Sequence, residues 1–297
     1  MCPNPIVFGL TLYDLLICVG IITCFFVFNH LADKAGLRVK LQKFTLLVGV
    51  CAISLGFGSA ILFQALYNIE DRGGFELTTD TGATFYGGLV GGIVTFILLY
   101  FALGRIFFRG ELAGYHGRSF FTVAGIAAPT IAVAHAFGRL GCLMAGCCHG
   151  APTDSFIGIM MHGDMGYQKY VPVQLFESIV LFALFALLFY RARKGERYNF
   201  SLYVLTYGVW RFLIEYARAD YRGSVPVLGL TPSQLTAVLM AFAAVGLFLI
   251  EKTVLDRMER AEKETPSADV AQTVDAGKTE APDEETEIEE NGDGTDE

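Results

Sequence analysis

The chain has 297 residues, 53% of them apolar, and a mean hydropathy of +0.47, which excludes an ordinary soluble domain and indicates a polytopic membrane protein. The formal net charge of −8 is unevenly distributed, because residues 261–297 hold 14 Asp and Glu against 2 Lys and the first 260 residues carry a balance of +4. Membrane lipid is therefore an expected partner, and nucleic acid is not.

Seven apolar segments are long enough to cross a bilayer as helices, since about 20 residues span its hydrocarbon core. We predict an all-α, polytopic membrane helix bundle of about seven transmembrane helices. The predicted spans are residues 6–28, 44–67, 85–103, 120–137, 172–190, 200–216 and 232–250.

Lysine and arginine are unevenly distributed over the loops between these spans. They are concentrated in residues 29–43, 104–119 and 191–199, and the alternate loops are poorer in both. The positive-inside rule places the basic loops in the cytoplasm. We therefore predict an N-terminus outside and a cytoplasmic C-terminus.

The chain divides into two predicted domains. Residues 1–255 form the transmembrane domain, and residues 256–297 form an acidic tail without any aromatic residue. Such a segment cannot bury enough apolar surface to offset its chain entropy. We expect the tail to be disordered and cytoplasmic.

The first and third spans each contain a tyrosine of interest. Tyr13 stands beside Asp14, a charge that needs a partner or water at this depth. Tyr86 opens the third span in the sequence FYGGLVGG, where an interfacial aromatic anchor is an equally good interpretation. The repeated glycine pairs of this sequence predict close helix packing.

The segment after the fourth span, HAFGRLGCLMAGCCHGAPT (residues 135–153), combines glycine, cysteine and charge. Polar groups at membrane depth are costly unless they line a cavity. Arg139 lies between Gly138 and Gly141, small residues that allow a ligand or another backbone to approach closely. The alternative is that the Arg139 side chain extends to the interface.

Three cysteines cluster in the same segment, at positions 142, 147 and 148. Their C-x4-C-C spacing does not match a C-x2-C pair, and the chain has no second cluster, so we expect neither a metal nor a cofactor. A disulfide joining Cys142 to Cys147 or Cys148 is possible on the outer side. Packing of three small apolar side chains is the simplest alternative.

Two later spans carry charged residues at helical spacing. Gln174 and Glu177 are three apart, so both can face inward. Arg211 and Glu215 are four apart and share a helix face, which Arg218 continues one turn on. An intramembrane arginine costs about 2.5–3.5 kcal/mol, so either a structural ion pair or a site for a lipid phosphate is indicated.

Four motifs resemble, in order and spacing, those of the prolipoprotein diacylglyceryl transferases. GRLGCLMAGCCHGAPT is similar to that family's G-R-x-G-N-x-x-N-G-E-x-x-G-x-P-T, and FYGGLVGG to F-H-G-G-L-x-G. VPVQLFES is similar to H-P-S-Q-L-Y-E, and RFLIEYARAD to R-F-x-x-E-x-x-R-x-x-D. The resemblance covers residues 6–250.

The resemblance implies an enzyme of the bacterial inner membrane, with several membrane passes. It implies transfer of a diacylglyceryl group from phosphatidylglycerol to the thiol of a lipobox cysteine in precursor proteins, with formation of a thioether. Arg211, Glu215 and Tyr86 are the implied catalytic residues. The substrate-binding candidates are Arg139, Gly138, Gly141, Gly150, Tyr13, Gln174, Glu177 and Arg218.

The chain departs from the family pattern where acid, base and amide groups are usual. Tyr86 and Val171 replace histidines, and a phenol with a pKa near 10 is a poor base at neutral pH. Cys142, Ala145 and Cys147 replace two asparagines and a glutamate. The alternative is therefore a phospholipid-binding paralogue with a thiol-based redox or other function, for which Cys142, Cys147 and Cys148 form the possible thiol site.

Overall fold

The computed structural model describes residues 10–69, 74–75, 77, 84–163, 166–218 and 230–264. The chain forms two compact units, residues 1–251 and 252–297. Helix α9 runs to Glu264, so residues 256–264 of the predicted tail are helical. The remainder of that tail, residues 265–297, lies outside the described residues.

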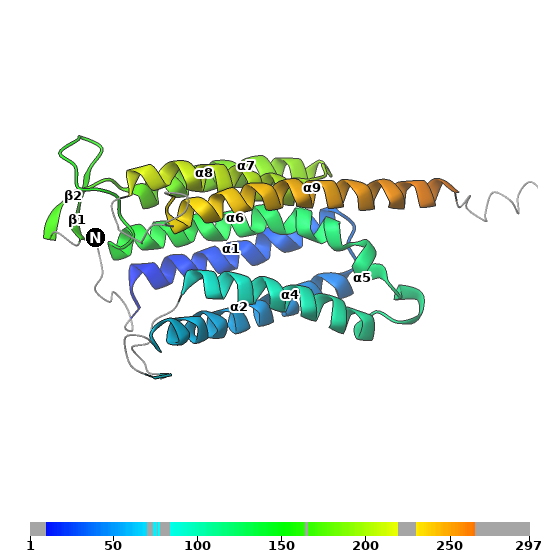
Figure 1. Ribbon diagram of the computed structural model, residues 1–297. Coiled ribbons are helices and arrows are strands. Elements are labelled where there is room, and N and C mark those ends of the chain that lie inside the picture. Colours follow the sequence, from blue (N-terminus) through cyan, green and yellow to red (C-terminus); the bar gives the residue numbers. More distant parts are fainter. Residues whose placement is uncertain are drawn as a thin grey trace, which may run out of the picture. The chain divides into compact units, whose positions relative to one another are not determined.

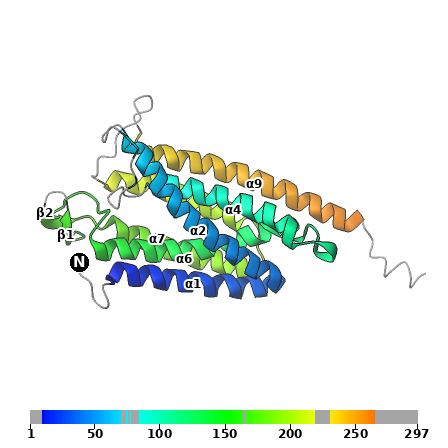
Figure 2. The ribbon, with the colours of Figure 1, turned by 90° about the horizontal axis from the view of Figure 1, so that it is seen from below.

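The predicted helical bundle is confirmed (Figures 1 and 2). Among the described residues, six helices are long and apolar enough to cross a membrane. They are α1 (Leu12–Lys34), α2 (Val39–Tyr67), α4 (Phe85–Phe107), α6 (Phe120–Ala145), α7 (Val173–Arg193) and α9 (Pro232–Glu264). Two short elements, η1 (Gly110–Leu112) and α5 (Tyr115–Arg118), follow α4.

The predicted span at 200–216 corresponds to helix α8 (Asn199–Ile214), which is shorter than the other six. Its 16 residues rise about 24 Å, less than the roughly 30 Å of a hydrocarbon core. The 3₁₀ turn η2 (Glu215–Ala217) extends it by about 6 Å. Seven crossings, and the orientation of the ends, therefore stay predictions.

A small β-hairpin was not expected in an all-helical chain. Strands β1 (Ile159–Gly163) and β2 (Gly166–Tyr170) pair antiparallel beyond the C-terminal end of α6 (Figure 1). The outermost pair of the register is Ile159 opposite Tyr170. This hairpin connects α6 to α7 and thus lies beside the segment richest in candidate site residues.

Helix α6 packs against α1, α7 and α8. Alanines on one face of α6 form a buried cluster with leucines of α7 and the rings of Tyr203 and Tyr207 from α8. On another face, the glycine of α1 at position 20 lies against Phe137, where an added Cβ would come within 2.9 Å of the phenylalanine Cβ. Because α6 is central, the residues near its C-terminal end can meet groups from several helices.

The glycine pairs of α4 allow α4 to pack closely against α2, as the sequence predicted. A Cβ on Gly91 would come within 2.4 Å of the Cβ of Ser59, whereas a Cβ on Gly92 meets nothing closer than 3.5 Å. The Ser59 hydroxyl also donates a hydrogen bond to the Gly87 carbonyl at 3.0 Å. Of these two glycines, Gly91 is thus the one that leaves no room for a side chain against α2.

We expect Gly91→Ala to destabilise the protein by about 1–3 kcal/mol, because two helix backbones must separate to admit the methyl group. The adjacent Gly92→Ala is the matched control, and it should be neutral or stabilising because alanine favours helix. Thermal unfolding of the detergent-solubilised protein measures both. Equal effects of the two substitutions would contradict this account of the α2–α4 contact.

Candidate active site

A fully buried carboxylate, Glu177 of α7, lies at the centre of the site. Its Oε1 lies 3.1 Å from Nη2 of Arg139 on α6 and accepts a 2.8 Å hydrogen bond from the hydroxyl of Tyr207 on α8. The Nε2 atom of His135 is 4.0 Å from the same oxygen, and its ring meets that of Tyr207 edge to face. Three helices thus converge on one carboxylate oxygen.

Helical spacing explains how these groups meet. His135 and Arg139 are one turn apart on α6, so they share the face that contacts α7. The prediction that Gln174 and Glu177 both face inward is confirmed, since both are fully buried. The Arg139 side chain is only 17% exposed and pairs with Glu177, so it does not extend to the interface.

Several buried polar atoms of this group have no hydrogen-bond partner within the part of the chain that the structure describes. They are Nε of Arg139, Oε2 of Glu177 and Oε1 of Gln174. Leaving a buried donor or acceptor unpaired costs about 1–3 kcal/mol, so such atoms indicate a place for a polar ligand. A guanidinium with a free N–H matches a phosphate oxygen well.

A second ion pair lies on α8 and η2. Nη1 of Arg211 is 2.9 Å from Oε2 of Glu215, which confirms the predicted pair. Arg211 also donates to the hydroxyl of Ser233 on α9 at 2.8 Å, and Thr231 donates to Glu215 at 2.9 Å. Both Arg211 and Arg139 act electrostatically on His135, so the two pairs belong to one charged region.

The prediction that Arg218 continues the helix face of Arg211 and Glu215 is wrong. Helix α8 ends at Ile214, the next three residues form a 3₁₀ turn, and Arg218 has an extended backbone (φ −89°, ψ 145°). Its side chain nevertheless acts electrostatically on Cys148, as Arg139 does. Arg218 thus belongs to the same charged region as Arg139, although it lies outside helix α8.

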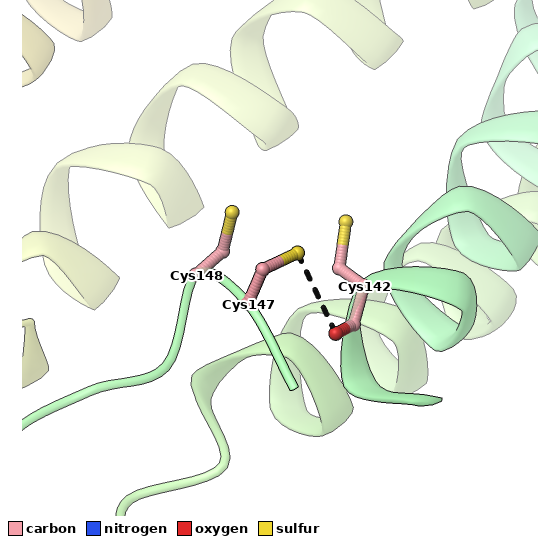
Figure 3. Close-up of side chains that lie close together, drawn as sticks. All are labelled: Cys142, Cys147 and Cys148. Atoms are coloured by element: carbon pink, nitrogen blue, oxygen red, sulfur yellow. Dashed lines mark hydrogen bonds between the residues drawn. The ribbon is translucent and has the colours of Figure 1, made fainter. Parts of the chain in front are cut away.

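The three cysteines gather at the end of α6 (Figure 3). Their Sγ atoms all lie within 4.8 Å of one another, and all three are free thiols, so the disulfide left open by the sequence is not formed. Gln174 donates a hydrogen bond from Nε2 to the carbonyl of Cys147. Hydrogen bonds from the thiols of Cys142 and Cys147 hold the pKa of the Cys148 thiol well below its ordinary value.

Comparison with known proteins decides the family. The sequence model of the family described as prolipoprotein diacylglyceryl transferase matches residues 5–250. The chain belongs to this family. The resemblance of the four motifs is thereby confirmed over the whole region expected.

Individual relatives support this membership in the transferase family. The chain is 28% identical to the phosphatidylglycerol–prolipoprotein diacylglyceryl transferase of Clostridium tetani, over 82% of this chain and 95% of the relative. It is 32% identical to the Clostridium perfringens protein named transferase 2, over 86% and 97%. A Staphylococcus aureus relative (strain bovine RF122 / ET3-1) is 27% identical, over 81% and 84%.

Two groups of the candidate site, Tyr207 and His135, were not among the residues predicted from the sequence. Tyr207 stands four residues before Arg211, and His135 four residues before Arg139, so each shares a helix face with a predicted arginine. This four-residue spacing from a predicted arginine could have identified both Tyr207 and His135 from the sequence. Tyr86 lies in α4, but its side chain falls outside the described part of the structure, as does the side chain of Phe85.

The predicted glycines have packing roles in the structure. A Cβ on Gly141 would come within 2.9 Å of the Tyr13 ring, which places Tyr13 of α1 against the end of α6. Gly138 is 3.8 Å from Ile17 by the same measure. Whether these glycines and Tyr13 also contact substrate stays a prediction.

Gly150 lies where three chain segments meet. Its N–H donates to the carbonyl of Val171 before α7, and the N–H of Ala151 donates to the carbonyl of Ala217 in η2. A Cβ on Gly150 would come within 2.5 Å of the Ala217 carbonyl oxygen and 3.0 Å of the Val171 Cβ. Only glycine fits here without displacing backbone.

We expect Gly150→Ala to reduce lipidation at least about tenfold, because a shift of roughly 1 Å in a catalytic group can cost up to 100-fold in rate. The control is Gly125→Ala on α6, where an added Cβ meets nothing within 4 Å. Transfer of labelled diacylglyceryl groups to a precursor peptide measures the effect. Full activity of Gly150→Ala would show that this junction tolerates displacement.

Proposed function

We propose that this protein transfers a diacylglyceryl group from phosphatidylglycerol to the lipobox cysteine of prolipoproteins, as a multi-pass enzyme of the bacterial inner membrane. Family membership and the names of the relatives support the reaction and both substrates. The structural observation that supports this function most strongly is the buried guanidinium of Arg139 beside Glu177, whose Nε finds no hydrogen-bond partner among the described residues.

The charge of the site suits a phosphodiester. Arg139, Arg211 and Arg218 together with Glu177 and Glu215 leave an excess of one positive charge, which balances the single negative charge of the lipid phosphate. Glu177 and Glu215 hold two of the guanidinium groups in fixed positions. Preorganised donors of this kind stabilise charge that develops on a departing phosphate.

The proposed reaction assigns a role to each of these groups. The thiolate of the acceptor cysteine attacks the glyceryl carbon that bears the phosphate, and a carbon–sulfur bond forms as the carbon–oxygen bond breaks. Glycerol phosphate leaves with the electron pair of that bond, and Arg139 and Arg211 stabilise its charge. In this proposal Glu215 orients Arg211, and Tyr86 donates a hydrogen bond near the attacking sulfur.

Complementation of a bacterial strain depleted of its own transferase tests this function. We expect the chain to restore growth and to lipidate a lipobox precursor, and a Tyr86→His variant to remain active. An Arg139→Gln variant should fail, although it inserts into the membrane to the same level. Failure of both the natural chain and Tyr86→His to lipidate the precursor would refute the transferase function.

A further inference from the structure

Two members of the three-cysteine cluster, Cys142 and Cys147, stand where the family pattern has an asparagine and a glutamate, so the chemistry of the cluster needs a separate explanation. Helix α6 ends at Ala145 and is capped by Gly146, which adopts a left-handed conformation (φ 78°). The N–H of Gly146 donates to the Leu143 carbonyl, and that of Cys147 donates to the Cys142 carbonyl. This turn reverses the chain and brings residues five apart in sequence side by side.

Two further features hold the cluster in place. Cys148 has a positive φ of 62°, an uncommon conformation for a residue other than glycine, and such strain is concentrated at functional sites. The fully buried Gln174 donates a hydrogen bond to the carbonyl of Cys147 from α7. The three sulfur atoms point to the same side of the chain (Figure 3).

The spacing of the sulfur atoms suits a thiophilic metal ion. With Zn–S bonds of about 2.3 Å, tetrahedral geometry places thiolate sulfurs about 3.8 Å apart. The three Sγ atoms already lie within 4.8 Å of one another. Side-chain rotations that move the sulfur atoms by about 1 Å would therefore bring them to the separation that zinc requires. Among the described residues, the ligand atoms that gather here are the three sulfur atoms alone, and His149, the next residue, contributes none. The Nδ1 atom of His149 contacts the carbonyl of Gly150, and its ring lies against Tyr170.

We propose that Cys142, Cys147 and Cys148 bind one Zn²⁺ ion and leave its fourth position open for the acceptor thiol. Structural zinc sites have four protein ligands, whereas catalytic sites have three and an open position. Cys147 is exposed and the other two thiols are half-buried, so an incoming group can reach the ion. Metal binding stands on this geometry alone, and the role of the ion rests on the proposed transferase function.

The ion would promote deprotonation of the acceptor thiol, for which the family pattern has a base that this chain lacks. An acceptor thiol that binds Zn²⁺ is deprotonated, and its proton passes to water. The metal-bound sulfur then attacks the glyceryl carbon, and the phosphate leaves with the electron pair of the carbon–oxygen bond. Zinc is not oxidised or reduced, so the step needs no further reactant.

Metal titration of the purified, reduced full-length protein tests the binding. We expect one Zn²⁺ per chain, and with Co²⁺ a charge-transfer absorption with the intensity of three thiolates. Cys142→Ser, Cys147→Ser and Cys148→Ser should each weaken binding more than about 100-fold, since even outer-shell losses cost 10–100-fold. Cys18→Ser, which changes an exposed cysteine of α1, is the matched control and should bind as the natural chain does.

Three results would overturn the proposal. They are the absence of stoichiometric binding, a Cys147→Ser variant that binds as tightly as the natural chain, and thiol trapping in cells that finds Cys142 in a disulfide. Thermal unfolding of the metal-free proteins shows whether each variant is folded. Cys147 lies outside the helices, so its serine variant is the most direct comparison.

Lipidation by metal-depleted and zinc-restored protein tests the role of the ion. We expect chelation to reduce the transfer rate at least tenfold and added Zn²⁺ to restore it. Lipidation that is unaffected by complete metal removal overturns the catalytic role while the transferase function stands. If the chain binds zinc tightly but never lipidates a precursor, the transferase function and the catalytic role of the ion are refuted. The proposal that the three cysteines bind zinc is then still supported.

Discussion

Glu177→Ala is expected to destabilise the protein by about 3–5 kcal/mol and to abolish lipidation, because it leaves a buried arginine without its counter-charge. The lost carboxylate oxygen is the partner of both Arg139 and Tyr207. Glu177→Gln should recover part of the stability, since the amide oxygen still accepts one hydrogen bond. Thermal unfolding and peptide lipidation measure the two effects.

A partly exposed ion pair provides the control for Glu177. Glu196 lies 2.6 Å from Arg191, but its side chain is 40% exposed. Glu196→Ala should therefore cost less than about 1 kcal/mol and leave lipidation unchanged. Similar losses for the two alanine variants would mean that the Glu177 carboxylate is not the buried centre of the site.

Arg211→Lys is expected to reduce the transfer rate about 10²–10³-fold, the usual effect of removing one preorganised donor to a developing oxyanion. Lysine keeps the charge but cannot hold Glu215 and Ser233 with a rigid, planar fork. The loss should therefore fall mainly on kcat rather than on phosphatidylglycerol binding. Single-turnover lipidation in phosphatidylglycerol vesicles separates the two quantities.

Two further variants serve as controls for the effect of Arg211→Lys on the transfer rate. Arg191→Lys, in the partly exposed pair, should leave the rate unchanged. Ser233→Ala removes only the hydroxyl that fixes one guanidinium nitrogen, so it should produce a smaller decrease of the same kind. An Arg211→Lys protein with a normal kcat would exclude a role for this guanidinium in the transition state.

The sequence predicted the helices well because apolar length is a local property. The Arg211–Glu215 pair was also local, since both residues stand on one helix. The Arg139–Glu177 pair was not predicted, because it depends on which helices are neighbours. Nothing in a single helical pattern states that α6 packs against both α7 and α8.

The metal-binding geometry of the cysteine cluster and the hairpin were not predicted, for a related reason. Counting residues from Cys142 to Cys147 gives a spacing unlike that of a metal motif, but the left-handed turn at Gly146 changes the distance in space. The strands of the hairpin, IMMHG and GYQKY, show no clear alternation of apolar and polar residues. In both places, backbone hydrogen bonds outside the regular helices determine the structure, and side-chain type predicts such bonds poorly.

The junction around Gly150 limits how this bundle can move. Backbone hydrogen bonds join the segments that follow α6, precede α7 and follow α8, through Gly150, Val171, Ala151 and Ala217. These bonds cross-brace one end of the three helices that carry the charged site. Relative movement of α6, α7 and α8 is therefore most restricted at this end of the three helices, and least restricted at the opposite end.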